Sequence, residues 1–159
     1  MTGTPHSHVG FVVRDLEAAM ARFSSVLGVT FNEPRTVHFD RLEDPEPRSA
    51  QIRVTFSREG PPHYELIEGD GRGIYALDRG EGVHHVGIWE EGAQERMAAL
   101  LAKGVTSEAR VVLADGSVLS WFNDPEDLHG VRVEFVDDAD RATYERFMKT
   151  GEFEGPMRL

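Results

Sequence analysis

The chain has 159 residues, of which 40% are hydrophobic and 28% are charged, as in an ordinary folded globular protein. Its length fits one domain, or two small units that share a core. The formal net charge of -11 argues against a nucleic-acid partner, because binding a phosphate backbone requires clustered Lys and Arg. Cysteine is absent, which excludes disulfides, thiolate nucleophiles and cysteine metal ligands, so a transition metal would need His, Asp or Glu.

No apolar run approaches the roughly 20 residues that a membrane-spanning helix needs. Residues 1–5 lack the basic segment followed by an apolar one that a secretory signal shows. We therefore expect a cytoplasmic protein that does not enter a membrane.

The first 68 residues have the pattern of a strand, a helix and three further strands. After a strand over 7–13, Asp15 is placed as the N-cap of a helix that starts at Leu16, and Gly28 is placed to end it. Strands are then predicted over 35–42, as an edge strand, and over 51–56 and 63–67. Residues 44–49 contain two prolines and are predicted to form a loop between them.

Residues 69–82, rich in glycine and charge, are predicted to connect the first unit to a second one over 83–137. In that unit a strand over 83–89 leads to a helix around 93–101, which ends near Gly104. Strands over 110–113, 118–122 and 131–136 complete the same order of elements. Residues 138–159 are predicted to form a C-terminal helix and a tail.

The first strands of the two units repeat each other, because His8-Val9-Gly10 and His85-Val86-Gly87 are each followed by a large apolar residue. The interval from the histidine to the glycine that ends the helix is 20 residues in the first unit and 19 in the second. Since side chains alternate along a strand, each histidine shares a face with the glycine two residues later, which leaves room beside the imidazole. His84 falls on the opposite, helix-covered face, so we predict a structural role for His84 and a functional one for His85.

The last strand of each unit carries one carboxylate between two large apolar residues, in Tyr64-Glu65-Leu66 and in Val133-Glu134-Phe135. Each glutamate therefore points to the face opposite its neighbours. One such residue is most simply a solvent-exposed side chain. Two of them at matching positions, in units whose first strands carry matching histidines, indicate a shared site.

Up to Val136 the sequence resembles the vicinal oxygen chelate superfamily, in which paired βαβββ modules form an open, cup-shaped sheet around a divalent metal. The resemblance implies an α+β fold with a mostly antiparallel sheet and helices outside. It also implies metal ligands from the first and last strands of each module, which here are His8, Glu65, His85 and Glu134. This ligand set resembles that of bacterial glyoxalase I enzymes, whereas residues 15–31 and 73–85 are more similar to methylmalonyl-CoA epimerase.

Two departures from that epimerase leave the substrate open. The epimerase usually has glutamine where this chain has Glu65. Its catalytic glutamate on the third strand falls at or near Gln51, and an amide cannot act as a carboxylate base.

Two imidazoles and two carboxylates suit Zn, Ni, Co, Mn or Fe(II), and the sequence does not choose among these metals. A six-coordinate ion with four protein ligands keeps two positions for adjacent substrate oxygens, which fits stabilisation of an enolate or enediolate. Glu134 or Glu65 would then move the proton. The sequence thus predicts a metal-dependent lyase, isomerase or epimerase that acts on a small carbonyl or thioester substrate, and the resemblance implies a homodimer.

Two alternatives stay open at this stage. A non-haem Fe(II) dioxygenase of the same superfamily needs only two histidines and one carboxylate, so the fourth ligand argues against it. A non-catalytic binder of the bleomycin-resistance type generally lacks the metal ligands, so the intact set argues against that interpretation as well.

Overall fold

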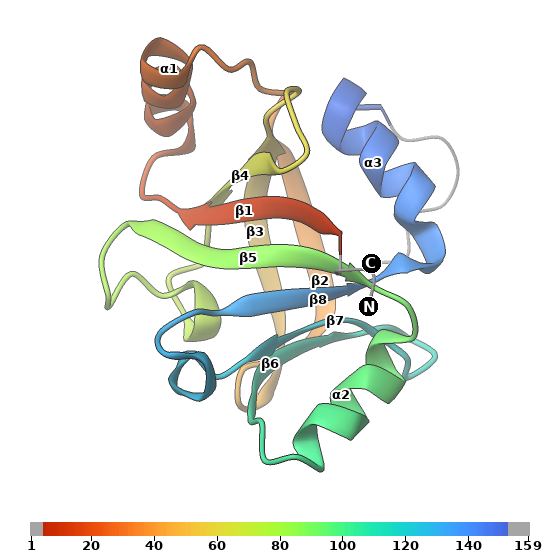
Figure 1. Cartoon of the computed structure of the whole chain (residues 1–159). Coiled ribbons are helices and arrows are strands. Elements are labelled where there is room, and N and C mark those ends of the chain that lie inside the picture. Colours follow the sequence, from red (N-terminus) through yellow and green to blue (C-terminus); the bar gives the residue numbers. More distant parts are fainter. Residues whose placement is uncertain (1–4, 153–159) are drawn as a thin grey trace.

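The structure is a computed structural model that describes residues 5–152, and in it the order β-α-β-β-β occurs twice (Figure 1). The strands are β1 (His6–Val12), β2 (Arg35–Glu43), β3 (Pro47–Phe56), β4 (His63–Glu68), β5 (Gly82–Glu90), β6 (Ser107–Val112), β7 (Val118–Asn123) and β8 (Val133–Asp137). The helices are α1 (Leu16–Leu27), α2 (Ala93–Leu101) and α3 (Arg141–Thr150), with short 3₁₀ turns at η1 (Gly73–Tyr75), η2 (Pro125–Leu128) and η3 (Asp138–Asp140). The predicted α+β fold of paired βαβββ modules is confirmed.

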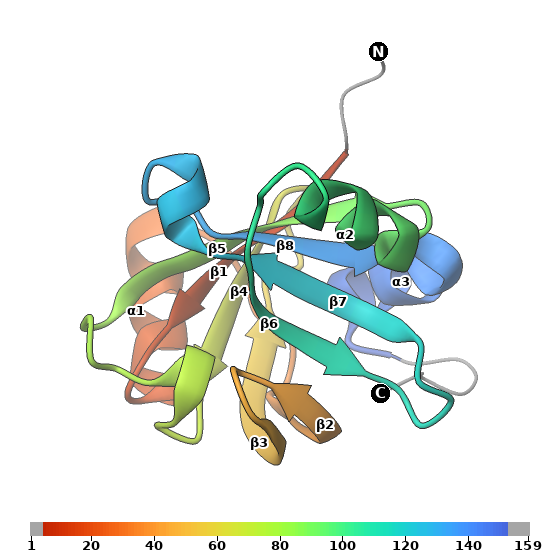
Figure 2. The same ribbon diagram turned by 90° about the horizontal axis from the view of Figure 1, so that it is seen from below.

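The eight strands form one mixed sheet that closes into a barrel in the order β1-β4-β3-β2-β6-β7-β8-β5. Two pairs are parallel, β1 with β4 and β5 with β8, and the other pairs are antiparallel. The two modules join where β1 lies beside β5 and again where β2 meets β6. Figure 2 shows the barrel from below with its helices on the outside. No helix in the described part of the chain is long and apolar enough to cross a membrane.

The ends of α1 follow the predicted capping residues. The carboxylate of Asp15 accepts a hydrogen bond of 2.8 Å from the backbone N–H of Ala18, which satisfies one of the free donors at the start of the helix. Gly28 ends the helix with φ 71°, a left-handed conformation that glycine adopts without steric cost. The first module therefore turns back onto the sheet where the sequence predicts it.

The apolar residues form an interior cluster, two clusters outside the barrel and one at its end. The interior cluster contains Phe39, Leu42, Ile52, Val54, Ala109, Val111 and Phe122, with Ile74 and Tyr75 from η1. Outside the barrel, Leu16 of α1 packs on Leu66, and Met97 of α2 packs with Trp121. Met148 of α3 packs with Trp89 and Val136 at the end of the barrel where β8 ends (Figure 1).

Two local predictions are wrong in part. The strand over 35–42 pairs with β3 alone over most of its length, as an edge strand does, but at its end Leu42 pairs with Val111 and Glu43 with Arg110, which closes the barrel. The predicted loop over 44–49 is too long, since β3 begins at Pro47, and proline is tolerated as the first residue of a strand. Both errors concern where strands pair, which depends on partners distant in the sequence.

Candidate functional site

Four neighbouring strands bring the predicted ligand residues together. His8 lies on β1, Glu65 on β4, His85 on β5 and Glu134 on β8, and one donor atom from each lies within 4.8 Å of those of the others. The two imidazole Nε2 atoms are 2.9 Å apart. Oε2 of Glu134 is 3.0 Å from Nε2 of His8 and 3.3 Å from Nε2 of His85, and Oε2 of Glu65 is 3.4 and 3.2 Å from the same atoms.

The strand register explains this convergence. Gly10 lies opposite both His85 and Glu65, while Gly87 lies opposite both His8 and Glu134. A Cβ atom on Gly10 would lie 2.1 Å from Cε1 of His85, and one on Gly87 would lie 2.2 Å from Cε1 of His8. Each glycine therefore makes room for the histidine of the other module. The space that the sequence predicts beside each imidazole exists, and the imidazole of the other module occupies it.

The four side chains are nearly shielded from water. His8 is 5% exposed and His85 is 2% exposed. Oε2 of Glu65 is buried and makes no hydrogen bond with any described residue, although it faces both Nε2 atoms. A buried carboxylate oxygen without a hydrogen bond is costly, and a cation bound between the four donors would compensate that cost.

The charges within the cluster shift two pKa values in opposite directions. Burial opposes a charge on His85, but the negative charges of Glu134 and Glu65, whose Oε2 atoms lie 3.3 and 3.2 Å from its Nε2, outweigh burial and raise the pKa of His85 to about 9. Burial likewise disfavours ionisation of Glu134, but the hydrogen bond from His8 and the nearby ring of His85 outweigh burial and hold the pKa of this carboxyl well below its usual value. Without a cation, His85 is therefore charged at neutral pH, with a proton on each ring nitrogen.

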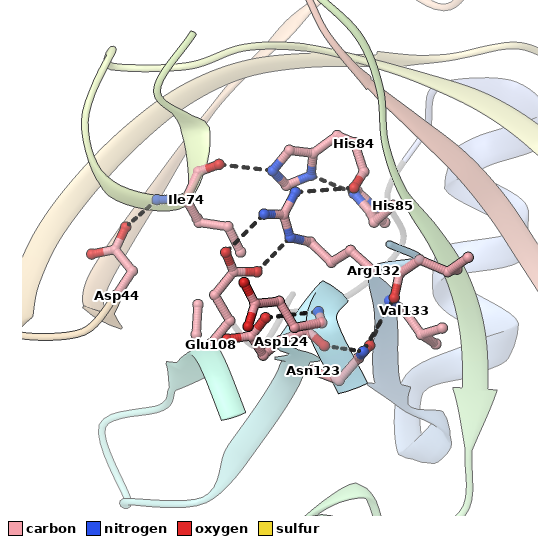
Figure 3. Close-up of polar contacts among 12 residues, drawn as sticks. Asp44, Ile74, His84, His85, Glu108, Asn123, Asp124, Arg132 and Val133 are labelled. Atoms are coloured by element: carbon pink, nitrogen blue, oxygen red, sulfur yellow. Dashed lines mark hydrogen bonds and ion pairs between the residues drawn. The ribbon is translucent and has the colours of Figure 1, made fainter. Parts of the chain in front are cut away.

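A second histidine determines how the ring of His85 is held. Nε2 of His84 lies 2.8 Å from the carbonyl oxygen of Ile74, so this nitrogen donates and Nδ1 of His84 carries the lone pair. That Nδ1 lies 2.8 Å from Nδ1 of His85, which must therefore donate (Figure 3). When His85 is neutral, as a metal ligand must be, this network keeps its proton on Nδ1, so the lone pair of Nε2 faces the other three donor atoms.

The backbone of Ile74 is held by two hydrogen bonds. Its N–H donates to Oδ2 of Asp44 at 3.0 Å, and its carbonyl accepts from His84 (Figure 3). Burial, with the charges of His85 and Arg132, lowers the pKa of His84 to about 3, so His84 stays neutral. Tyr75 stacks on its ring with an interplanar angle of 23°. The connector between the modules thus orients a residue of the site.

The prediction that His84 faces the helices is wrong. The pairing of β5 with β1 shifts register next to His84, since Gly10 pairs with His85 and the next residue of β1 pairs with Val83. This β-bulge turns His84 inward beside His85, and Nη1 of Arg132 donates to its backbone carbonyl (Figure 3). Alternation alone misses the residue, because the sequence gives no sign of the bulge.

A pocket of about 300 Å³ opens in front of the cluster, inside the end of the barrel beside α3. His8, Glu65 and Glu134 form one part of its wall. The rest of the wall is mostly aliphatic and aromatic and comes from β2, β3, β5, β7, β8 and α3. Three of the four converging residues can therefore be reached by a small molecule.

Comparison with known proteins gives the family. A model described as the Glyoxalase/Bleomycin resistance protein/Dioxygenase superfamily matches residues 7–119, which is most of the chain. The chain belongs to this superfamily. A separate comparison with curated proteins found no match.

Several solved structures share the fold of this chain. One is a variant of the methylmalonyl-CoA epimerase of Streptomyces coelicolor in complex with 2-nitronate-propionyl-CoA, with 23% identity, a TM-score of 0.60, and 86% of this chain and 98% of that chain covered. A methylmalonyl-CoA epimerase in complex with methylmalonyl-CoA and NH4+ has 23% identity, a TM-score of 0.60 and coverages of 86% and 95%. The epimerase of Mycobacterium tuberculosis has 22% identity, a TM-score of 0.61 and coverages of 87% and 91%.

Gln51 does not take part in the site of this superfamily member. It is exposed on the outer face of β3, opposite His38 on β2. The inward positions of β3 that line the pocket are Ile52, Val54 and Phe56, all apolar. The third strand therefore supplies neither a carboxylate nor an amide to the pocket, and Glu65 and Glu134 are the carboxylates among the residues that line it.

Proposed function

We propose that this protein is a divalent-metal-dependent lyase, isomerase or epimerase that stabilises an enolate or enediolate of a small carbonyl or thioester substrate. The observation that supports this best is the convergence of His8, Glu65, His85 and Glu134, of which all but His85 line a pocket. Membership of the superfamily agrees with it, as does the shared fold with methylmalonyl-CoA epimerases that bind acyl-CoA ligands.

The donor set fits a divalent cation. Two neutral imidazole nitrogens and two carboxylates are ligands that Zn, Ni, Co, Mn and Fe(II) all accept. The buried Oε2 of Glu65, which lacks a hydrogen bond, and the facing Nε2 atoms of the two histidines favour a cation between them. Such a cation, when bound, would act as a Lewis acid for negative charge that develops on a substrate oxygen.

The residues of the chain would handle the proton. In the proposed reaction a carboxylate removes a proton from the carbon next to the carbonyl and returns it to the same or a neighbouring carbon. Glu65 and Glu134 are the candidates, because they lie at the inner end of the pocket where the substrate carbonyl would sit. His84 orients His85, and the apolar wall excludes water from the reacting carbon.

Metal analysis and proton exchange test the proposal. The purified protein should bind one divalent ion per chain after loading, and metal-loaded protein in D2O should exchange the α-proton of one member of a panel of glutathione hemithioacetals and acyl-CoA thioesters. Glu65→Gln and Glu134→Gln should each reduce exchange, whereas Glu91→Gln, an exposed surface residue, should not. Loaded protein that consumes O2 with an aromatic or 2-oxo acid substrate would contradict the proposal in favour of a dioxygenase. If the protein binds a member of this panel but no metal, the proposed function is wrong and a non-catalytic small-molecule-binding protein is favoured.

We also propose a homodimer, as the resemblance implies, and a location in the cytoplasm. Light scattering of the purified protein, with and without metal, would measure the oligomeric state directly. A monomer at micromolar concentration would contradict the dimer without affecting the proposed chemistry.

A further inference from the structure

The residues that line the pocket indicate the chemical nature of the part of the substrate that lies outside its carbonyl group. We propose that the pocket selects carbonyl substrates with an uncharged aliphatic or aromatic body. This inference rests on the proposed function, because it takes the cluster of His8, Glu65, His85 and Glu134 as the end that holds the substrate oxygens. The side chains that carry the inference are Val37, Ile52, Val54, Leu119, Val136 and Phe147.

The shape of the pocket favours a small apolar group. Its volume of about 300 Å³ lies at the lower end of the range for small-molecule sites, so it holds a compact group and not a whole cofactor. In the strand order of the barrel, β2 and β3 form one part of the wall and β5, β7 and β8 form another, and α3 completes the lining. An apolar body placed there would gain free energy from leaving water.

The distribution of charge disfavours a second anionic group on the substrate. Arg35 is the one Lys or Arg side chain among the residues that line the pocket. It is exposed at the start of β2, and its guanidinium donates to the carbonyl of Gly151. A carboxylate on the substrate body would therefore lose its hydration deep in the pocket without a buried cation beside it, which is strongly unfavourable. An acyl group with its own carboxylate, such as methylmalonyl, is disfavoured for this reason.

The wall formed by α3 is held in place from both ends. Near its C-terminus, Nδ2 of the buried Asn32 donates to the carbonyls of Phe147 and Met148, at 3.3 and 2.7 Å. At its N-terminus, the guanidinium of Arg141 lies 5.8 Å from the ring centre of Trp89. These contacts keep the apolar face of α3 against the barrel (Figure 1), so the pocket is formed before a ligand arrives.

Three hydroxamates with the same metal-binding group and different bodies test the inference. A hydroxamate presents two adjacent oxygens to a divalent metal, and its affinity for the metal-loaded protein can be measured by calorimetry. Phenylacetohydroxamate, with an apolar body, should bind about tenfold tighter than acetohydroxamate or better, because the phenyl ring leaves water for the pocket. Succinic monohydroxamate, whose body carries a carboxylate, should bind no tighter than acetohydroxamate.

A variant pair locates the effect in the pocket. Val37→Asp introduces a charge into the wall at a half-buried position, so the ratio between phenylacetohydroxamate and acetohydroxamate affinities should fall towards one. Val26→Asp makes the same change on the outer face of α1, where the side chain is 61% exposed, and should leave the ratio as in the unaltered protein. Because the ratio is measured within each protein, a change in overall metal loading does not affect it.

The outcomes separate this inference from the proposed function. If all three hydroxamates bind with similar affinity, or if succinic monohydroxamate binds tightest, the metal site stands and the apolar-body inference is wrong. If loaded protein binds none of them, including acetohydroxamate, the proposed function fails and the inference fails with it. The three ligands on the unaltered protein decide the question even if Val37→Asp does not fold.

Discussion

Gly10 on β1 lies directly opposite His85 on β5, and an added Cβ on Gly10 would lie 2.1 Å from the Cε1 atom of that imidazole. Gly87 stands in the same relation to His8, at 2.2 Å. The two modules therefore depend on each other, because the glycine of each one admits the histidine of the other. A site built by one module alone would lack both the room and half of its donor atoms.

The first prediction concerns the close contact between Gly10 and the ring of His85. Gly10→Ala should destabilise the metal-free protein by about 1–3 kcal/mol, as overpacking of a buried contact does, and should abolish tight metal binding. His85→Ala removes the ring that the new methyl group meets. The cost of Gly10→Ala, measured by urea unfolding, should therefore largely disappear in the His85→Ala background. If Gly10→Ala lowers the free energy of unfolding equally in both backgrounds, the contact with the His85 ring is not the cause of the destabilisation.

The second prediction concerns His84. Replacing it with Phe removes the acceptor for Nδ1–H of His85 and should weaken metal affinity about 10- to 100-fold. His84→Gln, which can still offer an oxygen, should restore part of that loss. His63 is also buried and bonded to a backbone carbonyl, that of Ser57, so His63→Phe is a matched control. Competition against a chelator measures all three variants, and equal losses at His63 and His84 would contradict a positioning role.

The third prediction concerns pH. The pKa of His85 is raised to about 9, above the value near 6.5 of an unfolded histidine. The stabilisation that its charge gives the metal-free fold is therefore complete below about pH 6.5 and is lost as the pH rises through 9. A metal ion at Nε2 must displace this proton. We expect release of about one proton per bound metal at pH 7.5. Calorimetry in buffers of different ionisation enthalpy counts that proton, and a count of zero would contradict the prediction.

The fourth prediction contrasts the two carboxylates. Oε2 of Glu134 accepts from His8 at 3.0 Å, whereas Oε2 of Glu65 is buried without a hydrogen bond. Glu134→Gln should therefore cost the metal-free protein about 1.5–3 kcal/mol of stability, the range for a hydrogen bond to a charged group. Glu65→Gln should cost it clearly less, and both changes should weaken metal binding. Thermal unfolding with and without metal distinguishes the two variants, and a larger cost for Glu65→Gln in the absence of metal would contradict this interpretation.

The sequence by itself determined the local order of the fold. Period-two alternation gave the face of each side chain along β1, β4 and β8, and Asp15 and Gly28 determined where α1 begins and ends. The repeated histidine, glycine and glutamate positions, together with the resemblance to the superfamily, identified the four residues that the structure brings together. The proposed limits of the modules, at 68, 82 and 137, stay a prediction. The strand faces and the helix caps depend on neighbours in the chain, so a single sequence is sufficient to predict them.

The tertiary structure decided what depends on partners far along the chain. His8 and Glu134 are 126 positions apart, and only the register of β1, β5 and β8 sets the 3.0 Å between them. The closure through β2 and β6, the bulge that turns His84 inward and the position of α3 at the pocket are of the same kind. Alternation fixes which way a side chain points within its strand. The distance between two side chains follows from the pairing of whole strands, which the free energy of the complete barrel selects.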